Sequence, residues 1–310
     1  MSMKKGQILL LLIAFSINNS EAFTQTSKVT KYENVVYGMI SGMALLMDVY
    51  QPANSNHIGI VFIVGSGSGY WAQEVYNHIS LKDNYFLDST YSGKWAQALV
   101  NKGYTVFMIN HRFAPRFHYS DIFSDCQRAV RFVRYNAKKY SVDPNHIGAM
   151  GHSSGGTLSS MLGVTDTTIV NAINGIDSLS SKVQAVVALA ATFNLADYNK
   201  KTDTAIQNNL MLRIMSNYVG ELPEEKNGEF ILSGKYAEAS PVTYISKDDA
   251  AFLIYYSDND PIAPPRQAAA FYNKLTENKV TSKVVVCHNC EHEPIPDMNE
   301  VDMWFKKYLK

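Results

Sequence analysis

Short apolar runs that alternate with helical patterns are the feature that most limits how this chain can fold. Apolar runs, most of them rich in β-branched residues, occur at 45–50, 58–64, 105–109, 147–150, 183–190, 252–256 and 283–287. Between them, apolar residues recur at helical spacing at 95–100, 122–137, 157–162, 268–275 and 301–309. Continuous apolar strands are typical of parallel sheets. Their alternation with helices predicts an α/β fold, in which a mostly parallel central sheet is covered by helices on both faces.

One stretch departs from this alternation. Residues 195–238 are polar and irregular and contain one helical segment. We interpret this stretch as a lid-like insertion over the sheet, because it lies between two predicted strands and no linker composition sets it apart. The sequence therefore predicts a single α/β domain over residues 23–310.

The composition is that of a globular protein and excludes several functional classes. The 310 residues are 46% hydrophobic, and the 28 basic side chains are balanced by 28 acidic ones. A chain without net positive charge or a basic cluster lacks the electrostatic surface on which nucleic-acid binding depends. We therefore expect no nucleic acid among its partners. No segment after residue 22 is long and apolar enough to span a bilayer.

The first 22 residues have the layout of a secretory signal peptide. Lys4 and Lys5 precede an apolar run at 8–17, and the small residues Ser20 and Ala22 occupy the −3 and −1 positions of a cleavage site. The run of about ten residues is short of the roughly twenty that a spanning helix needs. An N-terminal anchor is the alternative. The sequence predicts a mature chain that begins after residue 22 and is secreted or periplasmic.

A G-x-S-x-G pattern, Gly151-His152-Ser153-Ser154-Gly155, stands between an apolar strand and a helix. In that context a sharp strand-to-helix turn holds the central residue in a strained conformation with its hydroxyl exposed. Glycines flank the turn because a Cβ there would clash across it. The helix N-terminus that follows directs backbone N–H groups toward a substrate oxygen. The context favours Ser153 as a nucleophile over an ordinary serine in a glycine-rich helix cap.

A nucleophilic serine needs a base, and the base needs an orienting carboxylate. Two predicted strands downstream of the serine end in loops that carry Asp258 and Asp260, and then His288 and His292. This order, and the position at strand ends, is typical of catalytic groups in open α/β sheets. Residue type alone leaves two candidates for each role. We favour Asp260, because Pro261 stiffens the turn after it. We favour His292, because the longer loop can curl back over the serine.

The loop after the first buried strand is the candidate oxyanion hole. Its sequence is Gly65-Ser66-Gly67-Ser68-Gly69. Small residues let backbone N–H groups approach a developing oxyanion closely. The loop also loosely fits a dinucleotide-binding pattern, which requires a second strand ending in an acidic residue about twenty positions on. Residues 83–93 are loop-like, so we expect no such cofactor. A hairpin loop without a function is the plainer alternative.

Five short segments between Val35 and the C-terminus carry a family resemblance. They read LMDVYQP at 46–52, NHRFAP at 110–115, DPNHI at 143–147, ASPV at 239–242 and DPIAP at 260–264. Together with the glycine-flanked serine they resemble α/β-hydrolases of the esterase and lipase kind. The nearest resemblance is to bacterial feruloyl- and acetyl-xylan-esterase-like (BD-FAE-like) hydrolases. It implies the α/β-hydrolase fold and a serine carboxylic-ester hydrolase that acts through an acyl-enzyme without a cofactor or a metal.

The resemblance also implies roles for individual residues. By position, Ser153 matches the family's nucleophile, Asp260 its acid and His292 its base. Ser66 and Gly67 match the oxyanion residues that follow the first central strand, with the N–H of Ser154 as the partner donor. The usual His-Gly-Gly-Gly reads Val-Gly-Ser-Gly at 64–67, so a register shifted to Ser68 and Gly69 is the alternative.

The cysteines offer a competing site. Cys126 lies on the apolar face of its predicted helix and is expected to be a buried thiol. Cys287 and Cys290 stand close to His292 in the segment CHNCEH. Three alternatives are open for this pair: a disulfide, two free thiols or a metal site. A bound metal would occupy His292 and exclude it as a base. A metal-binding or non-catalytic exported protein is therefore an alternative function.

The sequence indicates less about the substrate than about the reaction. Aromatic residues, Tyr70 and Trp71 among them, cluster after the oxyanion loop. Two roles are open to them: to stack on a sugar or an aryl acyl group of the substrate, or to pack in the core. Export together with the resemblance favours acetyl or feruloyl esters of a polysaccharide, or small esters, as substrates. A serine peptidase or amidase on the same fold is the alternative activity.

Overall fold

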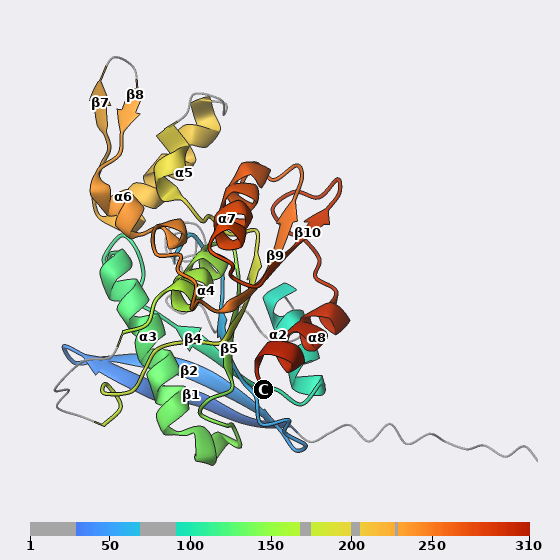
Figure 1. Ribbon diagram of the computed structural model, residues 1–310. Coiled ribbons are helices and arrows are strands. Elements are labelled where there is room, and N and C mark those ends of the chain that lie inside the picture. Colours follow the sequence, from blue (N-terminus) through green and yellow to red (C-terminus); the bar gives the residue numbers. More distant parts are fainter. Residues whose placement is uncertain (1–28, 69–90, 168–174, 200–204, 227–228) are drawn as a thin grey trace, which may run out of the picture.

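A mostly parallel sheet of eight strands forms the centre of the molecule (Figure 1). The computed structural model describes residues 29–68, 91–167, 175–199, 205–226 and 229–310. The strand order is β1-β2-β4-β3-β5-β6-β9-β10. The bounds are β1 (Val29–Ile40), β2 (Met43–Pro52), β3 (Gly59–Ile63), β4 (Thr105–Asn110), β5 (Ile147–His152), β6 (Ala185–Leu189), β9 (Ala251–Ser257) and β10 (Ser282–Cys287). β2 pairs antiparallel with β1 and β4, and every other pair is parallel, which confirms the predicted sheet.

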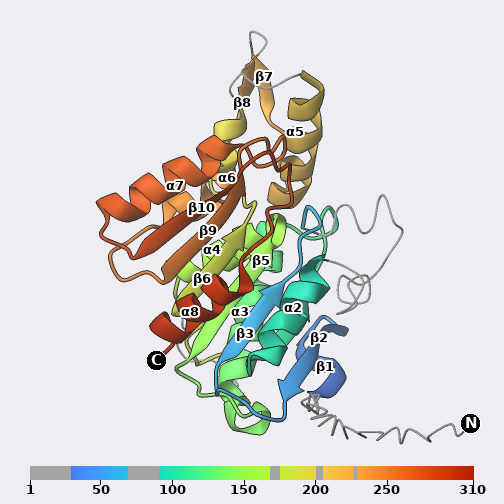
Figure 2. The ribbon, with the colours of Figure 1, turned by 90° about the vertical axis from the view of Figure 1, so that its right-hand side faces the viewer.

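Helices cover both faces of this sheet (Figure 2). α3 (Tyr119–Tyr135), α4 (Ser154–Val164) and α7 (Pro265–Glu277) pack on one face, and α2 (Tyr91–Asn101) and α8 (Met298–Tyr308) pack on the other. Alternate residues of a strand point to opposite faces. In β3, Val61 and Ile63 therefore join the core under α3 and α4, whereas Ile60 and Phe62 join the core under α2 and α8. This double burial explains why the strands are continuous apolar runs.

The strands and helices predicted from apolar runs all have counterparts in the structure, but β1 was not predicted. Its residues are mostly exposed, and the register with β2 shifts between Tyr32 and Val35 and again between Val36 and Gly38. An edge strand that buries little and is interrupted by irregularities has no regular alternation to detect. The position of β1 is fixed by its pairing with β2.

The stretch 195–238 contains more regular structure than the one helix predicted. It comprises η2 (Leu195–Asn199), α5 (Ala205–Val219), the hairpin β7 (Glu224–Lys226) and β8 (Glu229–Ile231), and α6 (Gly234–Glu238), followed by η3 (Pro241–Thr243). α5 and the hairpin lie at one end of the molecule (Figures 1 and 2). Met211, Leu212 and Met215 of α5 are buried in the same core as α3 and α4. A role for this segment as a lid stays a prediction.

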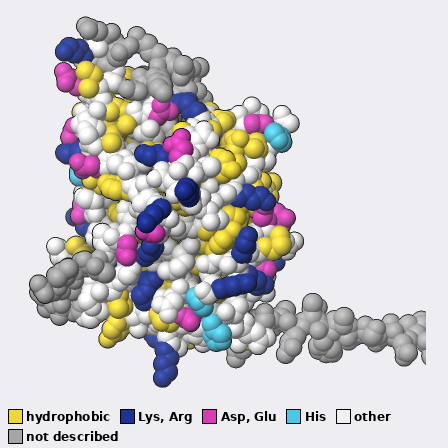
Figure 3. All heavy atoms as spheres, in the orientation of Figure 1, with side chains coloured by type: hydrophobic (Ala, Val, Ile, Leu, Met, Phe, Trp, Pro, Cys, Tyr) yellow, Lys and Arg dark blue, Asp and Glu magenta, His cyan; other side chains and the backbone are white. Residues whose placement is uncertain are grey.

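Several predictions concern residues outside the described ones. The signal peptide at 1–22 and the aromatic residues Tyr70 and Trp71 lie there, as does Gly69. In the part of the chain that the structure describes, none of the helices has both the length and the apolar composition that crossing a membrane requires. On the face shown in Figure 3, basic and acidic side chains are interspersed, in keeping with the balanced composition.

Candidate active site

The turn between β5 and α4 holds Ser153 in an unusual backbone conformation. Its φ is 55° and its ψ −126°, a region in which a residue with a side chain is strained. A Cβ on Gly151 would lie 2.3 Å from the carbonyl oxygen of Gly155, and a Cβ on Gly155 would lie 2.0 Å from that of Ile63. Both positions therefore require glycine. The sharp turn predicted from the sequence is present and places Ser153 at the N-terminus of α4.

Three side chains from three loops meet at this turn. The hydroxyl Oγ of Ser153 lies 2.8 Å from Nε2 of His292. The other ring nitrogen of His292, Nδ1, lies 2.8 Å from Oδ2 and 3.0 Å from Oδ1 of Asp260. Because a carboxylate accepts hydrogen bonds, Nδ1 carries the proton in this arrangement and Nε2 is free to accept the one from Ser153.

The surroundings of Asp260 keep its carboxylate in place. Its side chain is fully buried, and Oδ1 accepts the backbone N–H groups of Ile262 and Ala263 at 2.8 Å each. These bonds form within the short turn that Pro261 begins. A buried carboxylate with fixed donors is suited to orient a neighbouring imidazole.

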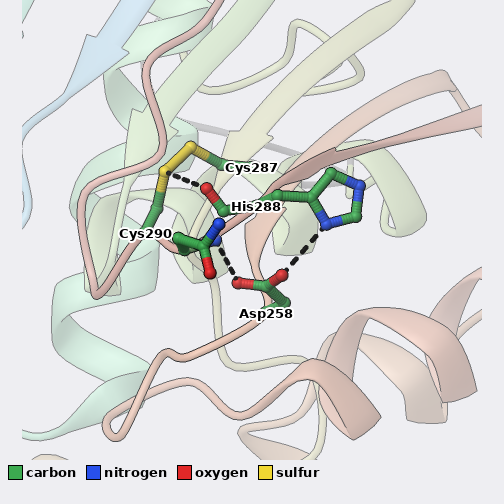
Figure 4. Close-up of a disulfide and its surroundings, with 5 residues drawn as sticks. Asp258, Cys287, His288 and Cys290 are labelled. Carbon is green, nitrogen blue, oxygen red and sulfur yellow. Dashed lines mark hydrogen bonds and ion pairs between the residues drawn. A yellow bond between two sulfur atoms is a disulfide. The ribbon is translucent and has the colours of Figure 1, made fainter.

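The competing candidates Asp258 and His288 contact each other. His288 Nδ1 lies 3.0 Å from Asp258 Oδ2, and Asp258 Oδ1 accepts the backbone N–H of Asn289 at 2.8 Å (Figure 4). The His288 side chain is 77% exposed, in contrast to 17% for His292. The structure thus brings Asp260 and His292, and not this second pair, to Ser153.

The predicted oxyanion loop is tied to the first turn of α4 by a side chain. The hydroxyl of Ser154 accepts the backbone N–H of Ser66 at 3.1 Å and that of Ser68 at 2.8 Å. Gly67 and Ser68 both have positive φ angles, 55° and 56°, so the loop turns sharply here. In this arrangement the N–H of Ser66 points at Ser154 Oγ. Its prediction as an oxyanion donor requires that bond to be released and stays a prediction.

A buried ion pair supports this loop from the side of β4. Arg112 donates from its side chain and its backbone to the carboxylate of Asp125, and both residues are buried. Close by in sequence, the N–H of Ala114 donates to the carbonyl oxygen of Ser68 at 3.1 Å. A bidentate buried pair holds one geometry, because separating it would leave a charge without a partner. Arg112 thereby fixes the segment on which Ser68 rests.

His152 has a structural role that was not predicted from the sequence. Its Nε2–H donates to the backbone carbonyl oxygen of His292 at 2.8 Å, and its ring centroid lies 5.1 Å from that of His292 and 5.8 Å from that of Trp95. Burial, with a smaller contribution from His292, lowers the pKa of His152 to about 4. His152 is therefore neutral at pH 7 and links the serine turn to the loop of the base. Its position beside Ser153 in the motif was the available signal.

Cys287 and Cys290 form a disulfide, so of the three alternatives for this pair the bridge is the one present. Cys126 is a buried free thiol, as predicted, and burial raises its pKa well above the usual value. Sulfurs bonded to each other are not available as thiolate ligands. Among the residues that the structure describes, no group of three or more His, Cys, Asp or Glu side chains is arranged to hold a metal ion.

The chain matches the family model named BD-FAE over residues 47–275, which is well over half of its length. The chain belongs to the BD-FAE family. The matched region contains the strand-to-helix turn with Ser153 and the loop with Asp260, and it ends before His292.

Individual proteins give the BD-FAE match further context. Residues of this chain are 30% identical to LipM of Mycobacterium tuberculosis, a probable carboxylic ester hydrolase, over 58% of this chain and 39% of LipM. They are 36% identical to an acetylxylan esterase of Xylanibacter ruminicola over 24% of this chain and 16% of that protein. The chain spans about two fifths of the length of the first curated relatives it matches.

A solved structure shares the fold. A truncated carbohydrate esterase from gut microbiota superposes with a TM-score of 0.69 over 92% of this chain and 98% of that chain, at 22% identity. Together with the observed sheet and helices, this likeness establishes the α/β-hydrolase fold that the resemblance implied.

Proposed function

We propose that this protein is a serine carboxylic-ester hydrolase that works through an acyl-enzyme. The observation that carries the proposal is the continuous hydrogen-bonded series from Ser153 Oγ through His292 to the buried carboxylate of Asp260. A hydroxyl is a weak nucleophile until a neighbouring base removes its proton. The ester-hydrolase names among the relatives support the same reaction class.

In the proposed reaction Ser153 Oγ attacks the ester carbonyl carbon while His292 Nε2 takes the hydroxyl proton. Asp260 keeps the proton on Nδ1 and stabilises the positively charged imidazolium. His292 then gives its proton to the departing alcohol, which leaves an acyl group on Ser153. Water, activated by the same imidazole, releases the acid and restores the serine.

The oxyanion that forms during attack needs hydrogen-bond donors at the serine turn. We assign this role to the backbone N–H groups of Ser154 and Gly67. Ser154 N–H belongs to the first turn of α4, where backbone donors lack intrahelical partners. Ser66 becomes a third donor if substrate binding releases its N–H from Ser154 Oγ.

We propose acyl esters as substrates, either acetyl or feruloyl groups on a polysaccharide or small esters. The acetylxylan esterase among the relatives supports a carbohydrate alcohol. We also propose that the protein is exported, because the disulfide Cys287–Cys290 is suited to an oxidising compartment and residues 1–22 have a signal-peptide layout.

The first test is the substitution Ser153→Ala together with active-site labelling. We expect kcat on p-nitrophenyl acetate to fall by about 10⁴-fold or more, because no acyl-enzyme can form, while the circular dichroism spectrum stays that of the wild type. A fluorophosphonate should label Ser153 in the wild type. Labelling at another residue, with Ser153 unmodified, would reject the proposal. Acetylated xylan and methyl ferulate, assayed in parallel, identify the acyl group.

The second test compares each proposed residue with its alternative of the same type, Asp260 with Asp258 and His292 with His288. Asp260→Asn should lower kcat by about 10⁴-fold, because the imidazole loses its orienting acceptor, whereas Asp258→Asn should cost less than about tenfold. His292→Ala should abolish turnover and His288→Ala should preserve most of it. The reverse ranking in either pair would transfer the role to Asp258 or His288.

A further inference from the structure

The second acid–histidine pair lies beside the loops of the first one. After β9 and β10 end side by side, with Ser257 opposite Cys287, the two chains remain hydrogen-bonded to each other. The N–H of Asp258 donates to the carbonyl oxygen of Cys287 at 3.2 Å, and that of Asn259 donates to the carbonyl oxygen of Cys290 at 3.2 Å. These contacts extend the pairing of the two strands into the loops that carry the acid and the base.

Two further bonds and a covalent bridge complete this contact (Figure 4). The carboxylate of Asp258 accepts the N–H of Asn289 at 2.8 Å and contacts the ring of His288 at 3.0 Å. The disulfide between Cys287 and Cys290 closes the same four-residue turn. We call residues 287–290, held by the bridge and by Asp258, the disulfide turn.

The disulfide turn stands directly next to the reacting groups in the chain. Asp260 follows Asn259, and a single residue, Glu291, separates Cys290 from His292. Glu291 and Glu293, on either side of His292, are exposed, whereas Pro294 and Pro296 further along the loop are buried. The course of the chain immediately before His292 therefore depends on the disulfide and the backbone hydrogen bonds more than on apolar packing.

We propose that the disulfide turn positions His292 against Asp260, so that the oxidation state of Cys287 and Cys290 sets the turnover rate. This inference rests on the proposed esterase function. Asp258 and His288, which resemble a second catalytic pair, belong to this positioning device. Displacement of a catalytic group by about 1 Å can cost on the order of 100-fold in rate. Opening the turn therefore lowers kcat and leaves KM unchanged, because the position of His292 affects proton transfer and not substrate binding.

Reduction by a dithiol is a balanced reaction at this site. A thiolate of dithiothreitol attacks one sulfur of the bridge, and a mixed disulfide forms while the other cysteine leaves as a thiolate. The second thiol of the reagent then closes its own ring. The protein gains two electrons and two protons, and dithiothreitol is oxidised to its cyclic disulfide.

The experiment compares the full-length protein in both oxidation states. The protein is reduced with dithiothreitol, desalted under nitrogen to remove the reagent, and assayed on p-nitrophenyl acetate. We expect kcat to fall by about 10- to 100-fold, KM to change by less than about twofold and reoxidation to restore the rate. The variant with both Cys287→Ser and Cys290→Ser should show the same loss and no response to the reductant. Unchanged kcat in the reduced protein would overturn the proposal.

Two controls separate positioning from general damage. Cys126→Ala removes the buried thiol outside the turn and should keep the wild-type response to reduction. Asp258→Ala removes both side-chain contacts to the turn, keeps the backbone bond of Asp258 to Cys287, and should lower kcat by about two- to tenfold without reduction. Asp143→Ala is the matched control for Asp258→Ala. Asp143 also accepts a backbone N–H, from Asn145, and also faces a histidine, His146, but it lies at the opposite end of the sheet. It should leave kcat unchanged.

A spectroscopic measurement keeps this inference separate from the proposed function. The proton on Nδ1 of His292, hydrogen-bonded to Asp260, is expected to give a low-field resonance in proton NMR, and no ester has to be present for it to be recorded. We expect this resonance in the oxidised protein and its loss or broadening after reduction and in Asp258→Ala. If the resonance responds and no ester is hydrolysed, the positioning role stands and the esterase function fails. If esters are hydrolysed and neither the resonance nor kcat responds, the positioning role fails.

Discussion

Among the single residues of the site, His152 has a charge state that differs most clearly between the folded and unfolded chains. Its pKa falls from 6.5 to about 4 on folding, chiefly through burial. Between these two values the unfolded chain binds a proton at His152 and the folded protein does not. Stability therefore decreases as the pH falls through this window and is unaffected by this group above it, a difference on the order of 3 kcal/mol.

Replacement of this imidazole should flatten the pH dependence of stability. We expect the free energy of unfolding of His152→Gln to change less between pH 6.5 and pH 4 than that of the wild type. The reason is that glutamine at position 152 does not bind a proton in this pH range. Urea denaturation followed by circular dichroism at a series of pH values measures the slope. A variant with the full wild-type slope would contradict the assignment.

The helix and the strand that carry the site approach each other closely because glycine, which has no side chain, stands at their contact. α4 crosses β3 so closely that a Cβ on Gly155 would lie 2.0 Å from the carbonyl oxygen of Ile63. A backbone oxygen cannot rotate out of the way, so a larger residue must separate the helix from the strand. The same movement would displace Ser153, which directly precedes α4.

Gly155→Ala should therefore reduce both stability and activity. We expect a loss of about 2–3 kcal/mol in the free energy of unfolding, with a large fall in kcat. The matched control is Gly234→Ala in the first turn of α6, where an added Cβ meets no atom within 4 Å. That variant should be neutral or more stable by up to about 1 kcal/mol. Equal effects of the two substitutions in thermal denaturation would refute the argument.

At the scale of the whole molecule, one sheet separates two cores that we expect to unfold together. Phe271 is fully buried in the core under α7, where it stacks on Phe193 with centroids 4.2 Å apart. Phe305 is fully buried in the opposite core, which also contains Trp95 and Trp304. Both cores are built on the same strands, so we expect that neither loses its packing alone. The single domain stays a prediction.

Thermal unfolding of two core variants tests that prediction. Phe271→Leu should lower the free energy of unfolding by about 1–3 kcal/mol and shift the transition seen by tryptophan fluorescence, although Trp95 and Trp304 lie on the other face. Phe305→Leu should shift the same transition. A fluorescence transition that stays in place in Phe271→Leu, while the circular dichroism transition moves, would indicate two independently unfolding units.

Some features of this protein follow from the sequence because they depend on neighbouring residues. The apolar runs fixed the buried strands, and the glycines around Ser153 fixed the turn, since both are local requirements of backbone and side-chain geometry. The order of serine, acid and histidine likewise follows from the chain itself. The sequence also favoured Asp260 and His292, on the stiffness of a turn and the length of a loop.

Other features were decided by the tertiary structure, because they depend on distances between segments far apart in the chain. The two Asp and two His residues are equivalent by type, and their pairing is determined by how the loops after β9 and β10 lie together. The contact of His152 with the loop of His292 joins residues 140 positions apart. β1 is held by pairing with β2 rather than by its own pattern. Such contacts form only when the sheet brings the segments together, so no local pattern encodes them.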